Sequence, residues 1–374
     1  MKKRKWLAFL MALCMAVTVL AGCSSSTTTE ESSTTEETTE TEETTDETTQ
    51  ETTEETAEGT EDEEASQYPN VKKDPALAMH VGFINGPTGM GAAMLMDENE
   101  NGFLFGNYDF QIYSDPTEVT SKIINGELDV AAVPVNLAAT LYNKTEGGVQ
   151  IAAINTLGTT YLVENGQNIS SMEDLEGKTV YLSGQGSVPD YVFTYLLAKS
   201  GITDCTVEYA TSHVELATKI AAGEVDLAVM PEPYVSIAMS QNDALRVAID
   251  LAEVWDTFSY EEPNVDNTLP MGCIVVRTAY LEEHEKEFKK FLDEYDNFID
   301  VVKEDYAAAA EKAAEFGIVE DAAVAEKAYP NCHITYIKGE PMVRLVDHFL
   351  NVMYETNAKS IGGALPEDDF YYIR

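Results

Sequence analysis

The chain has 374 residues and a formal net charge of −43 at pH 7. This length suffices for one or two well-packed domains, and so negative a charge excludes a general nucleic-acid binder. Residues 24–66 contain 17 Asp and Glu, no Lys or Arg, and little else but Thr and Ser. Such a segment cannot bury enough apolar surface to fold, so we expect a disordered spacer. Residues 67–374 still carry a net charge of −30, so the folded part is also acidic.

The first 23 residues combine four basic residues, a short apolar run and the sequence Leu-Ala-Gly-Cys, which ends at Cys23. This pattern resembles the signal peptide and lipobox of bacterial lipoproteins. The resemblance implies cleavage before Cys23, lipidation of Cys23 and a location on the extracytoplasmic face of the cell membrane. An ordinary signal peptide with an incidental cysteine is the alternative. No later apolar run reaches about 18 residues, so we expect no membrane span after processing.

From residue 79 onward, apolar strand patterns alternate with amphipathic helix patterns. We expect a strand over 79–84, a glycine turn, a helix over 92–102, a strand over 108–114, a helix, a strand over 127–134 and a further helix from Pro134 or just after it. Asp115 before Pro116 predicts the N-cap and the first position of the helix between the second and third strands.

The same order of elements then recurs. Residues 119–144 and 216–241 match at an offset of 97, and the identical pairs include Gly126/Gly223, Asp129/Asp226 and Pro134/Pro231. The second copy predicts strands within 178–186, 205–210 and 224–231, with helices within 187–201 and 211–223. Alternating strands and helices favour parallel strands joined by right-handed crossovers, with helices on both faces of a sheet. The sequence therefore predicts two similar α/β lobes, each built on its own sheet.

Two segments are expected to cross between these lobes. Residues 149–177 predict two strands and a short helix, opened by a capping box from Ser170 to Glu173 and closed at Gly177. Residues 269–281 predict a strand that crosses back. A long amphipathic helix follows, with one face formed by Phe288, Phe291, Leu292, Tyr295, Phe298, Ile299 and Val302. The predicted division places 67–157 and 275–374 in lobe 1 and 158–274 in lobe 2, with a hinge and a cleft between the lobes.

Ligands of parallel α/β sheets bind beyond the carboxyl ends of the strands. This rule selects the loops 85–90, 134–136, 183–187 and 231–234, in which glycines let backbone N–H groups approach a ligand. None of these loops contains Lys or Arg, and one contains Glu232. Glu232 would repel a fixed anion and would accept hydrogen bonds from an amine, an amide or an aminopyrimidine. It is equally compatible with a carboxylate at a helix start that points to solvent.

Three aromatic residues near these loops, Tyr161, Tyr191 and Tyr234, are candidates for stacking on a flat ligand, although ordinary packing is the more common role. The segment 254–264, which contains Trp255, is a candidate lid or a loop packed on its own lobe. The spacing of Cys205, Cys273 and Cys332 fits no zinc pattern, so these residues are expected to be buried and to form at most one disulfide. His333 is expected to be a packed or surface residue rather than a ligand.

The runs GVQIAAINTLGTTYLVENGQNISSMEDLEGKTVYLSGQGSVPDYVFTYLLAKSGI, LATKIAAGEVDLAVMPEPY and MGCIVVRTAYLEEHEKEFKKFL resemble solute-binding proteins of ABC importers. The nearest branch handles nitrate, sulfonates and thiamine precursors. The resemblance implies a type II periplasmic-binding fold, an α/β architecture of two lobes joined by two crossing segments around a central cleft. It implies ligand contacts from Asn85, Thr88, Gly89, Met90, Asn136, Gln185, Gly186, Ser187, Glu232 and Tyr234.

The family also implies partners and an activity. The expected partners are a small organic solute of sulfonate, carboxylate or heterocycle type and an ABC permease with its ATPase, and we expect a monomer without a cofactor, metal or catalytic residues. The four loops lack the basic side chains expected of nitrate binders, and the chain lacks the cysteine-rich motif of pyrimidine-precursor relatives.

Two other functions compete with solute transport. One is an enzyme on the same fold, since menaquinone-pathway dehydratases and a pyrimidine synthase share it, although those enzymes lack an export signal. The sequence has no GxSxG elbow, HExxH motif or phosphate loop, and GPTGMG has the wrong spacing for a dinucleotide loop. The other is a surface protein with a sensory or adhesive role.

Overall fold

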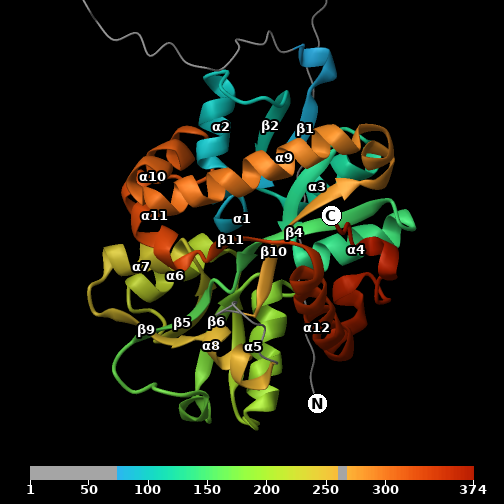
Figure 1. The fold of residues 1–374 in the computed structure, drawn as a ribbon. Helices are drawn as coiled ribbons and strands as arrows, with labels where there is room; N and C mark the ends of the chain where they lie inside the picture. Colours follow the sequence, from blue (N-terminus) through green and yellow to red (C-terminus); the bar gives the residue numbers. More distant parts are fainter. Residues whose placement is uncertain (1–73, 260–267) are drawn as a thin grey trace, which may run out of the picture. The chain divides into compact units, whose positions relative to one another are not determined.

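The computed structural model describes residues 74–259 and 268–374. The predicted signal peptide, Cys23 and the acidic spacer lie outside these residues, as does part of the candidate lid. The described chain forms two β-sheets covered by helices (Figure 1). Among the helices described, none combines the length and the apolar character that a membrane span requires.

Sheet A has six strands in the order β11-β4-β10-β3-β1-β2. Its strands are β1 (Met79–Ile84), β2 (Tyr108–Tyr113), β3 (Val130–Pro134), β4 (Val149–Leu157), β10 (Pro270–Arg277) and β11 (Ile334–Ile337). β1 pairs in parallel with β2 and with β3, whereas β10 is antiparallel to both β3 and β4. The predicted lobe boundary between residues 274 and 275 falls within β10, which pairs in sheet A along its length.

Sheet B has five strands in the order β7-β6-β8-β5-β9. Its strands are β5 (Thr160–Asn165), β6 (Thr179–Ser183), β7 (Thr206–Ala210), β8 (Leu227–Pro231) and β9 (Leu245–Asp250). β6 pairs in parallel with β7 and β8, and β5 runs antiparallel to β8 and β9. The prediction of parallel strands is therefore correct for the three repeated strands of each sheet. The strands that cross between the lobes, for which the sequence analysis predicted no direction, are antiparallel to their neighbours.

The sequence duplication corresponds to a duplicated structural unit. β2-β1-β3 in sheet A matches β7-β6-β8 in sheet B, because in each sheet the first strand of the repeat lies between the next two. The offset of 97 places α3 (Pro116–Asn125) onto the whole of α6 (His213–Ala221), and it places β3 onto β8. Both helices end in a glycine turn, with φ of 75° at Gly126 and 72° at Gly223.

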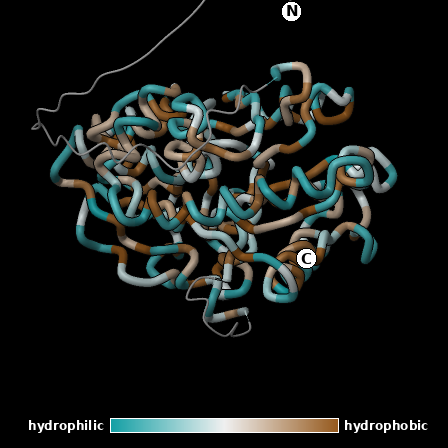
Figure 2. Tube along the Cα trace, turned by 45° about the horizontal axis from the view of Figure 1, so that its top comes forward, coloured by the Kyte–Doolittle hydropathy of each residue, from teal (hydrophilic) through white to brown (hydrophobic). Residues whose placement is uncertain are grey.

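The remaining helices pack on the sheets and between them. They are α1 (Pro87–Met90), α2 (Ala93–Glu100), α4 (Val135–Thr145), α5 (Val188–Lys199), α7 (Tyr234–Gln241), α8 (Leu251–Phe258), α9 (Thr278–Glu304), α10 (Tyr306–Glu315), α11 (Ala322–Ala328) and α12 (Gly339–Asn357), with short 3-10 turns at 75–77, 172–175, 329–331, 358–361 and 368–370. Figure 1 shows α9 crossing in front of sheet A. Hydrophilic and hydrophobic residues alternate along the helical turns in Figure 2, as amphipathic helices require.

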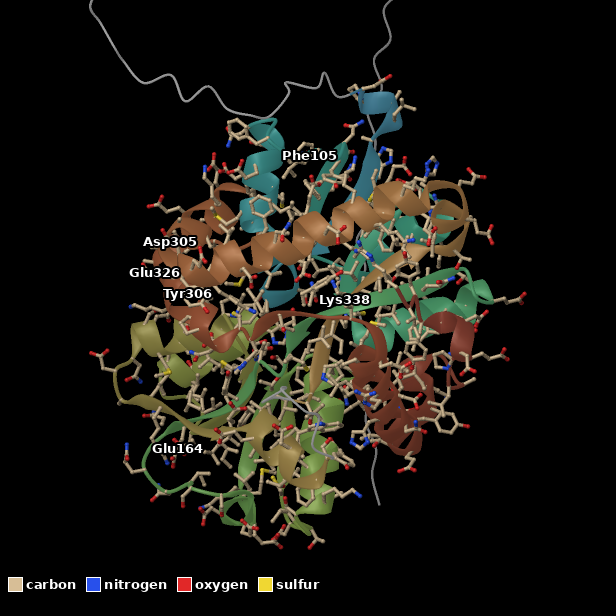
Figure 3. The ribbon with its side chains drawn as sticks, viewed as in Figure 1. Phe105, Glu164, Asp305, Tyr306, Glu326 and Lys338 are labelled. Carbon is tan, nitrogen blue, oxygen red and sulfur yellow. The ribbon has the colours of Figure 1, made fainter. Side chains whose placement is uncertain are left out.

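The predicted face of α9 is buried, except that Phe298 is only half-buried. Glu294 is a polar residue within this buried face, and its carboxylate accepts hydrogen bonds from the backbone N–H of Phe105 at 2.8 Å and from the Tyr108 hydroxyl. A second buried carboxylate belongs to sheet B, where Glu164 on β5 (Figure 3) forms an ion pair with Arg246 at 2.6 Å. Both carboxylates are buried and hydrogen-bonded, so each anchors a loop or a strand.

Several local predictions need correction or refinement. The capping box lies one residue later than predicted, because Asp174, not Glu173, accepts hydrogen bonds from the backbone of Ser170 and Ser171 at 2.8 and 3.1 Å. It opens a 3-10 turn rather than an α-helix. Trp255 is buried on α8, where its ring centroid lies 5.3 Å from that of Tyr195 on α5 and 6.0 Å from that of Phe349 on α12, so it packs against both lobes. The cysteines at 205, 273 and 332 are free thiols.

Candidate functional site

A cavity of about 460 Å³ lies between the carboxyl ends of the repeated strands of both sheets. We call it the cleft cavity. Its lining comprises Ile84, Asn85, Gly86, Pro87, Thr88, Ser114, Pro116, Pro134, Asn136, Leu137, Thr156, Thr159, Ser187, Val188, Pro189, His213, Pro231, Glu232, Tyr234 and Met271. All four loops that the carboxyl-end rule selected contribute to it. Its volume suits a small organic molecule.

Six of the ten predicted contact residues line the cleft cavity, and they are Asn85, Thr88, Asn136, Ser187, Glu232 and Tyr234. Gly89 does not line it and is buried, and a Cβ at that position would lie 2.4 Å from the carbonyl oxygen of Ile84. Met90 does not line it either, since its side chain is fully buried against the Cys332 sulfur, 3.8 Å away. The one-turn helix α1 thus directs these two residues into lobe 1.

Gln185 and Gly186 also lie outside the lining of the cleft cavity, and both are exposed. Gly186 uses its backbone N–H within its own loop, where it donates to the Asp190 carboxylate at 2.8 Å. This bond ties the loop after β6 to the first turn of α5. Ser187, the next residue, lines the cavity, and its hydroxyl has no hydrogen-bond partner among the residues that the structure describes.

The sequence analysis missed two groups of lining residues. Ser114 and His213 follow β2 and β7, so applying the carboxyl-end rule to the edge strands as well would have found them. Thr159 and Met271 lie at the amino-terminal ends of β5 and β10. These two strands run antiparallel to β8 and β3, and their first residues therefore lie beside the carboxyl ends of their neighbours. The carboxyl-end rule for parallel strands therefore does not predict that Thr159 and Met271 line the cavity.

Glu232 lies in the wall of the cleft cavity with only 1% of its surface exposed. One carboxylate oxygen accepts a hydrogen bond from the Ser236 backbone at 3.0 Å, and the other accepts from the Ser236 hydroxyl at 3.0 Å. Asn331, which belongs to the segment leading to sheet A, donates to the same second oxygen at 3.3 Å. Burial raises the pKa of Glu232, and these hydrogen bonds act in the opposite direction. The solvent-pointing interpretation of Glu232 is therefore wrong.

A pair of stacked rings forms another part of the wall. The rings of His213 and Tyr234 lie 4.9 Å apart with an interplanar angle of 27°. His213 Nδ1 is hydrogen-bonded to the hydroxyl of Ser183, which is buried behind the cavity wall. Burial lowers the pKa of His213, so its ring is neutral near pH 7. The pair presents an aromatic surface and an uncharged imidazole to the cavity.

The lining of the cleft cavity contains no Lys or Arg, and Glu232 is its one carboxylate. Elsewhere in the described parts of the chain, no cluster of three or more His, Cys, Asp or Glu has the geometry of a metal site. The polar groups that remain are amides, hydroxyls and the imidazole. These groups donate and accept hydrogen bonds without a fixed positive charge.

The other two candidate aromatics, Tyr161 and Tyr191, do not line the cleft cavity. The Tyr161 hydroxyl donates to the backbone carbonyl of Asn331 at 3.0 Å and lies 3.1 Å from His333 Nε2. The Tyr191 hydroxyl accepts a hydrogen bond from Asn357 at 3.2 Å. Each tyrosine therefore connects lobe 2 to the carboxyl-terminal part of the chain, and His333 is half-buried beside Tyr161.

Two mixed α/β sheets with a cavity between the carboxyl ends of their repeated strands define a periplasmic-binding-protein fold. The profile of a protein family described as NMT1/THI5 like matches residues 108–309, more than half of the chain, and the chain belongs to this family. A search of functionally curated sequences found no significant match.

Solved structures of transporter components are similar to this chain. The crystal structure of an ABC transporter from Parabacteroides distasonis shares 25% identity, covering 79% of this chain and 98% of the other, with a TM-score of 0.66. The periplasmic aliphatic sulphonate binding protein SsuA from Escherichia coli shares 16% identity over 78% of this chain and 95% of its own, with a TM-score of 0.61. The ligand binding component of an ABC-type import system from Staphylococcus aureus shares 11% identity over 79% and 96%, with a TM-score of 0.60.

Proposed function

We propose that this protein is the extracytoplasmic solute-binding component of an ABC importer. The cleft cavity carries this proposal, because it lies between two lobes, at the strand ends where ligands of α/β sheets bind, and has the volume of a small organic solute. The related structures are described as parts of ABC transport systems. The two lobes, one built on sheet A and the other on sheet B, would close on the solute about the two crossing segments.

The lining supports an organic solute recognised by hydrogen bonds and stacking. Amides, hydroxyls and a neutral His213 surround the cavity, and the His213–Tyr234 pair offers a ring surface. Without Lys or Arg in the lining, an inorganic anion would be held by uncharged hydrogen-bond donors alone. We therefore favour a heterocycle or another uncharged solute over a sulfonate or carboxylate.

The proposal includes a lipid anchor at Cys23 and delivery to a membrane permease with its ATPase. The lipobox sequence supports the anchor, and the acidic spacer of residues 24–66 would separate the folded part from the membrane surface. The hydrogen bond between Ser183 and His213 gives little support to an enzymatic role, because Ser183 is buried and does not line the cavity.

The first test is a thermal-shift screen of the purified protein against nitrogen heterocycles, thiamine precursors, amino acids, aromatic acids and sulfonates. A bound solute at about 100 times its dissociation constant stabilises the folded protein by roughly 2.7 kcal/mol, which moves Tm visibly. We expect a hit among the heterocycles. Native mass spectrometry of the freshly purified protein would detect a solute that co-purifies.

A pair of matched variants tests whether the solute binds in the cleft cavity. Asn85→Trp places a large ring on an exposed residue of the lining, and Asn351→Trp makes the same change on the exposed surface of α12. The first variant should abolish the thermal shift, and the second should retain it. Equal shifts in both variants would contradict a site in the cleft cavity, and turnover of the bound compound would favour an enzyme.

A further inference from the structure

The position of the His213 ring in the wall of the cleft cavity follows from the pairing of β6 with β7. Ser183, the last residue of β6, lies opposite Ala210, the last residue of β7, and α6 begins at His213 three residues later. The carboxyl ends of two neighbouring strands thus bring Ser183 beside the imidazole, and its hydroxyl is hydrogen-bonded to Nδ1. The stacked ring of Tyr234 covers one face of the same imidazole.

The imidazole of His213 carries a single proton near neutral pH. Burial lowers its pKa. His213 is also the first residue of α6, where the helix dipole disfavours a positive charge. A neutral imidazole has one N–H donor and one acceptor nitrogen, so the hydrogen bond made by Nδ1 decides which of the two Nε2 presents to the cavity.

Ser183 decides which nitrogen of His213 carries the proton. Its side chain is only 1% exposed, and within the described parts of the chain the bond to Nδ1 is the one hydrogen bond of its hydroxyl. A proton on Nδ1 would turn this hydroxyl into the acceptor and leave its buried O–H without a partner. An unpaired buried donor costs more than an unused lone pair on a hydroxyl that already donates. The hydrogen-bond balance therefore favours a Ser183 that donates to Nδ1 and a proton on Nε2.

Nε2, the other nitrogen of His213, is free to meet a solute. It has no hydrogen-bond partner among the described residues, and they do not enclose it. Since His213 lines the cleft cavity, a group of the solute can approach Nε2 there. Glu232, the carboxylate of the lining, is not the acceptor of this N–H, because its oxygens are engaged by Ser236 and Asn331.

We propose that His213 determines solute specificity by donating a hydrogen bond from Nε2 to a neutral acceptor of the solute, a ring nitrogen or a carbonyl oxygen, and that Ser183 is the positioning residue that holds this tautomer. The inference rests on the proposed function, because it takes the cleft cavity as the solute site. The acceptor is neutral because no Lys or Arg lines the cavity. A solute of the same shape without the acceptor should bind about 2- to 12-fold more weakly, the equivalent of one hydrogen bond.

Nitrogen NMR of the imidazole tests the tautomer in the full chain without any solute. Long-range correlations from the carbon-bound ring protons identify the protonated nitrogen, and a His213→Asn variant assigns the signals. We expect the proton on Nε2, and an Nδ1 signal shifted as in a nitrogen that accepts a hydrogen bond. Ser183→Ala should return the Nδ1 signal to the value of an unbonded nitrogen, and Ser183→Thr, which retains a hydroxyl, should restore the shift.

A matched pair of bicyclic probes tests the donor by isothermal titration calorimetry. Benzimidazole and indole share one shape and each has one N–H, but only benzimidazole has an acceptor nitrogen in its ring. The wild type should prefer benzimidazole, and His213→Phe, which keeps a ring beside Tyr234, should lose the preference. The double variant Ser183→Ala/His213→Phe makes the same test without an unpaired hydroxyl. The control is His284→Phe on α9, because the His284 imidazole stacks on Tyr280 at 4.7 Å outside the cleft cavity.

A wild-type proton on Nδ1 would overturn the inference and leave the proposed function intact, and an Nδ1 signal unchanged in Ser183→Ala would overturn the positioning role. Equal affinities of the two bicycles for the wild type, or an undiminished preference in both variants that carry His213→Phe, would overturn the donor role. A wild type that binds neither bicycle would also overturn the inference. The proposed function fails only if no compound of the thermal-shift screen stabilises the protein.

Discussion

Asn331 donates a hydrogen bond to the Glu232 carboxylate at 3.3 Å and so joins the segment before β11 in sheet A to the loop after β8 in sheet B. The backbone carbonyl of Asn331 also accepts from Tyr161, at the start of sheet B. One residue of lobe 1 thus holds two positions of lobe 2 beside the cleft cavity. The carboxylate in the cavity wall is thus part of a contact between the two lobes.

Replacing Asn331 with Ala should lower the free energy of unfolding by about 0.5–1.5 kcal/mol, the usual value of one hydrogen bond. Urea denaturation measures this loss. The backbone bond to Tyr161 is retained in the variant, so the change isolates the bond to Glu232. Asn351→Ala, which removes an exposed amide that bonds within α12, is the control and should change stability less. Equal losses in both variants would contradict a specific contribution from the interlobe contact.

Glu232→Gln should destabilise the protein by about 1–3 kcal/mol at neutral pH. The Ser236 backbone and hydroxyl both donate to the carboxylate, so an amide turns an NH₂ group toward one of these donors. Chemical denaturation would measure the loss, and Glu320→Gln at an exposed position is the control. A variant as stable as the wild type would contradict a stabilising contribution from the hydrogen bonds between Ser236 and the carboxylate.

The stability of Glu232→Gln relative to the wild type should also depend on pH. Burial raises the pKa of Glu232 above its ordinary value of 4.5, so the folded protein binds this proton more tightly than the unfolded chain. The stability that this proton contributes is present below 4.5 and is lost as the pH rises through the raised value. The free energy of unfolding of the wild type should therefore rise relative to that of the variant as the pH falls from about 7.5 to about 4. A constant difference across this range would show that Glu232 titrates normally.

His213 should titrate below its ordinary pKa of 6.5, because burial disfavours the charged imidazole. The unfolded chain then binds the proton more tightly, so the stability from neutral His213 is complete above 6.5 and is lost as the pH falls toward the lowered value. An NMR titration of the imidazole, assigned with a His213→Asn variant, measures the midpoint. A midpoint at or above 6.5 would contradict the lowered pKa of His213.

Tyr234→Ala should weaken the binding of an aromatic solute by about 0.5–1.5 kcal/mol, because it removes the ring that lines the cleft cavity beside His213. Tyr234→Phe retains the ring and should preserve most of the affinity. Calorimetry with a hit from the heterocycle screen measures both changes, and Tyr354→Ala on the exposed side of α12 is the control. Equal affinity of Tyr234→Ala and the wild type would exclude stacking on this ring.

Local sequence signals predicted the repeated elements well. The apolar run at 79–84 is β1, and Asp115 caps α3 by accepting from the Thr117 backbone at 2.8 Å. The duplicated residues anticipated that β3 and β8 end alike, in Pro134 and Pro231, and both prolines line the cleft cavity. Caps, glycine turns and apolar periods depend on neighbouring residues, so a sequence reports them directly.

The site was predicted only in part, because the carboxyl-end rule places a loop at the site but does not say which of its side chains point into the cavity. Asn85 and Met90 belong to one loop, yet only Asn85 reaches the cleft cavity, since Met90 packs against Cys332 from a distant segment. Met271 enters the cavity only because β10 returns antiparallel to β3. By itself, the sequence determined two lobes, their repeated strands and the loops at the strand ends. Tertiary packing decided which side chains line the cleft cavity and brought Asn331 onto Glu232, because these contacts depend on residues far apart in the chain.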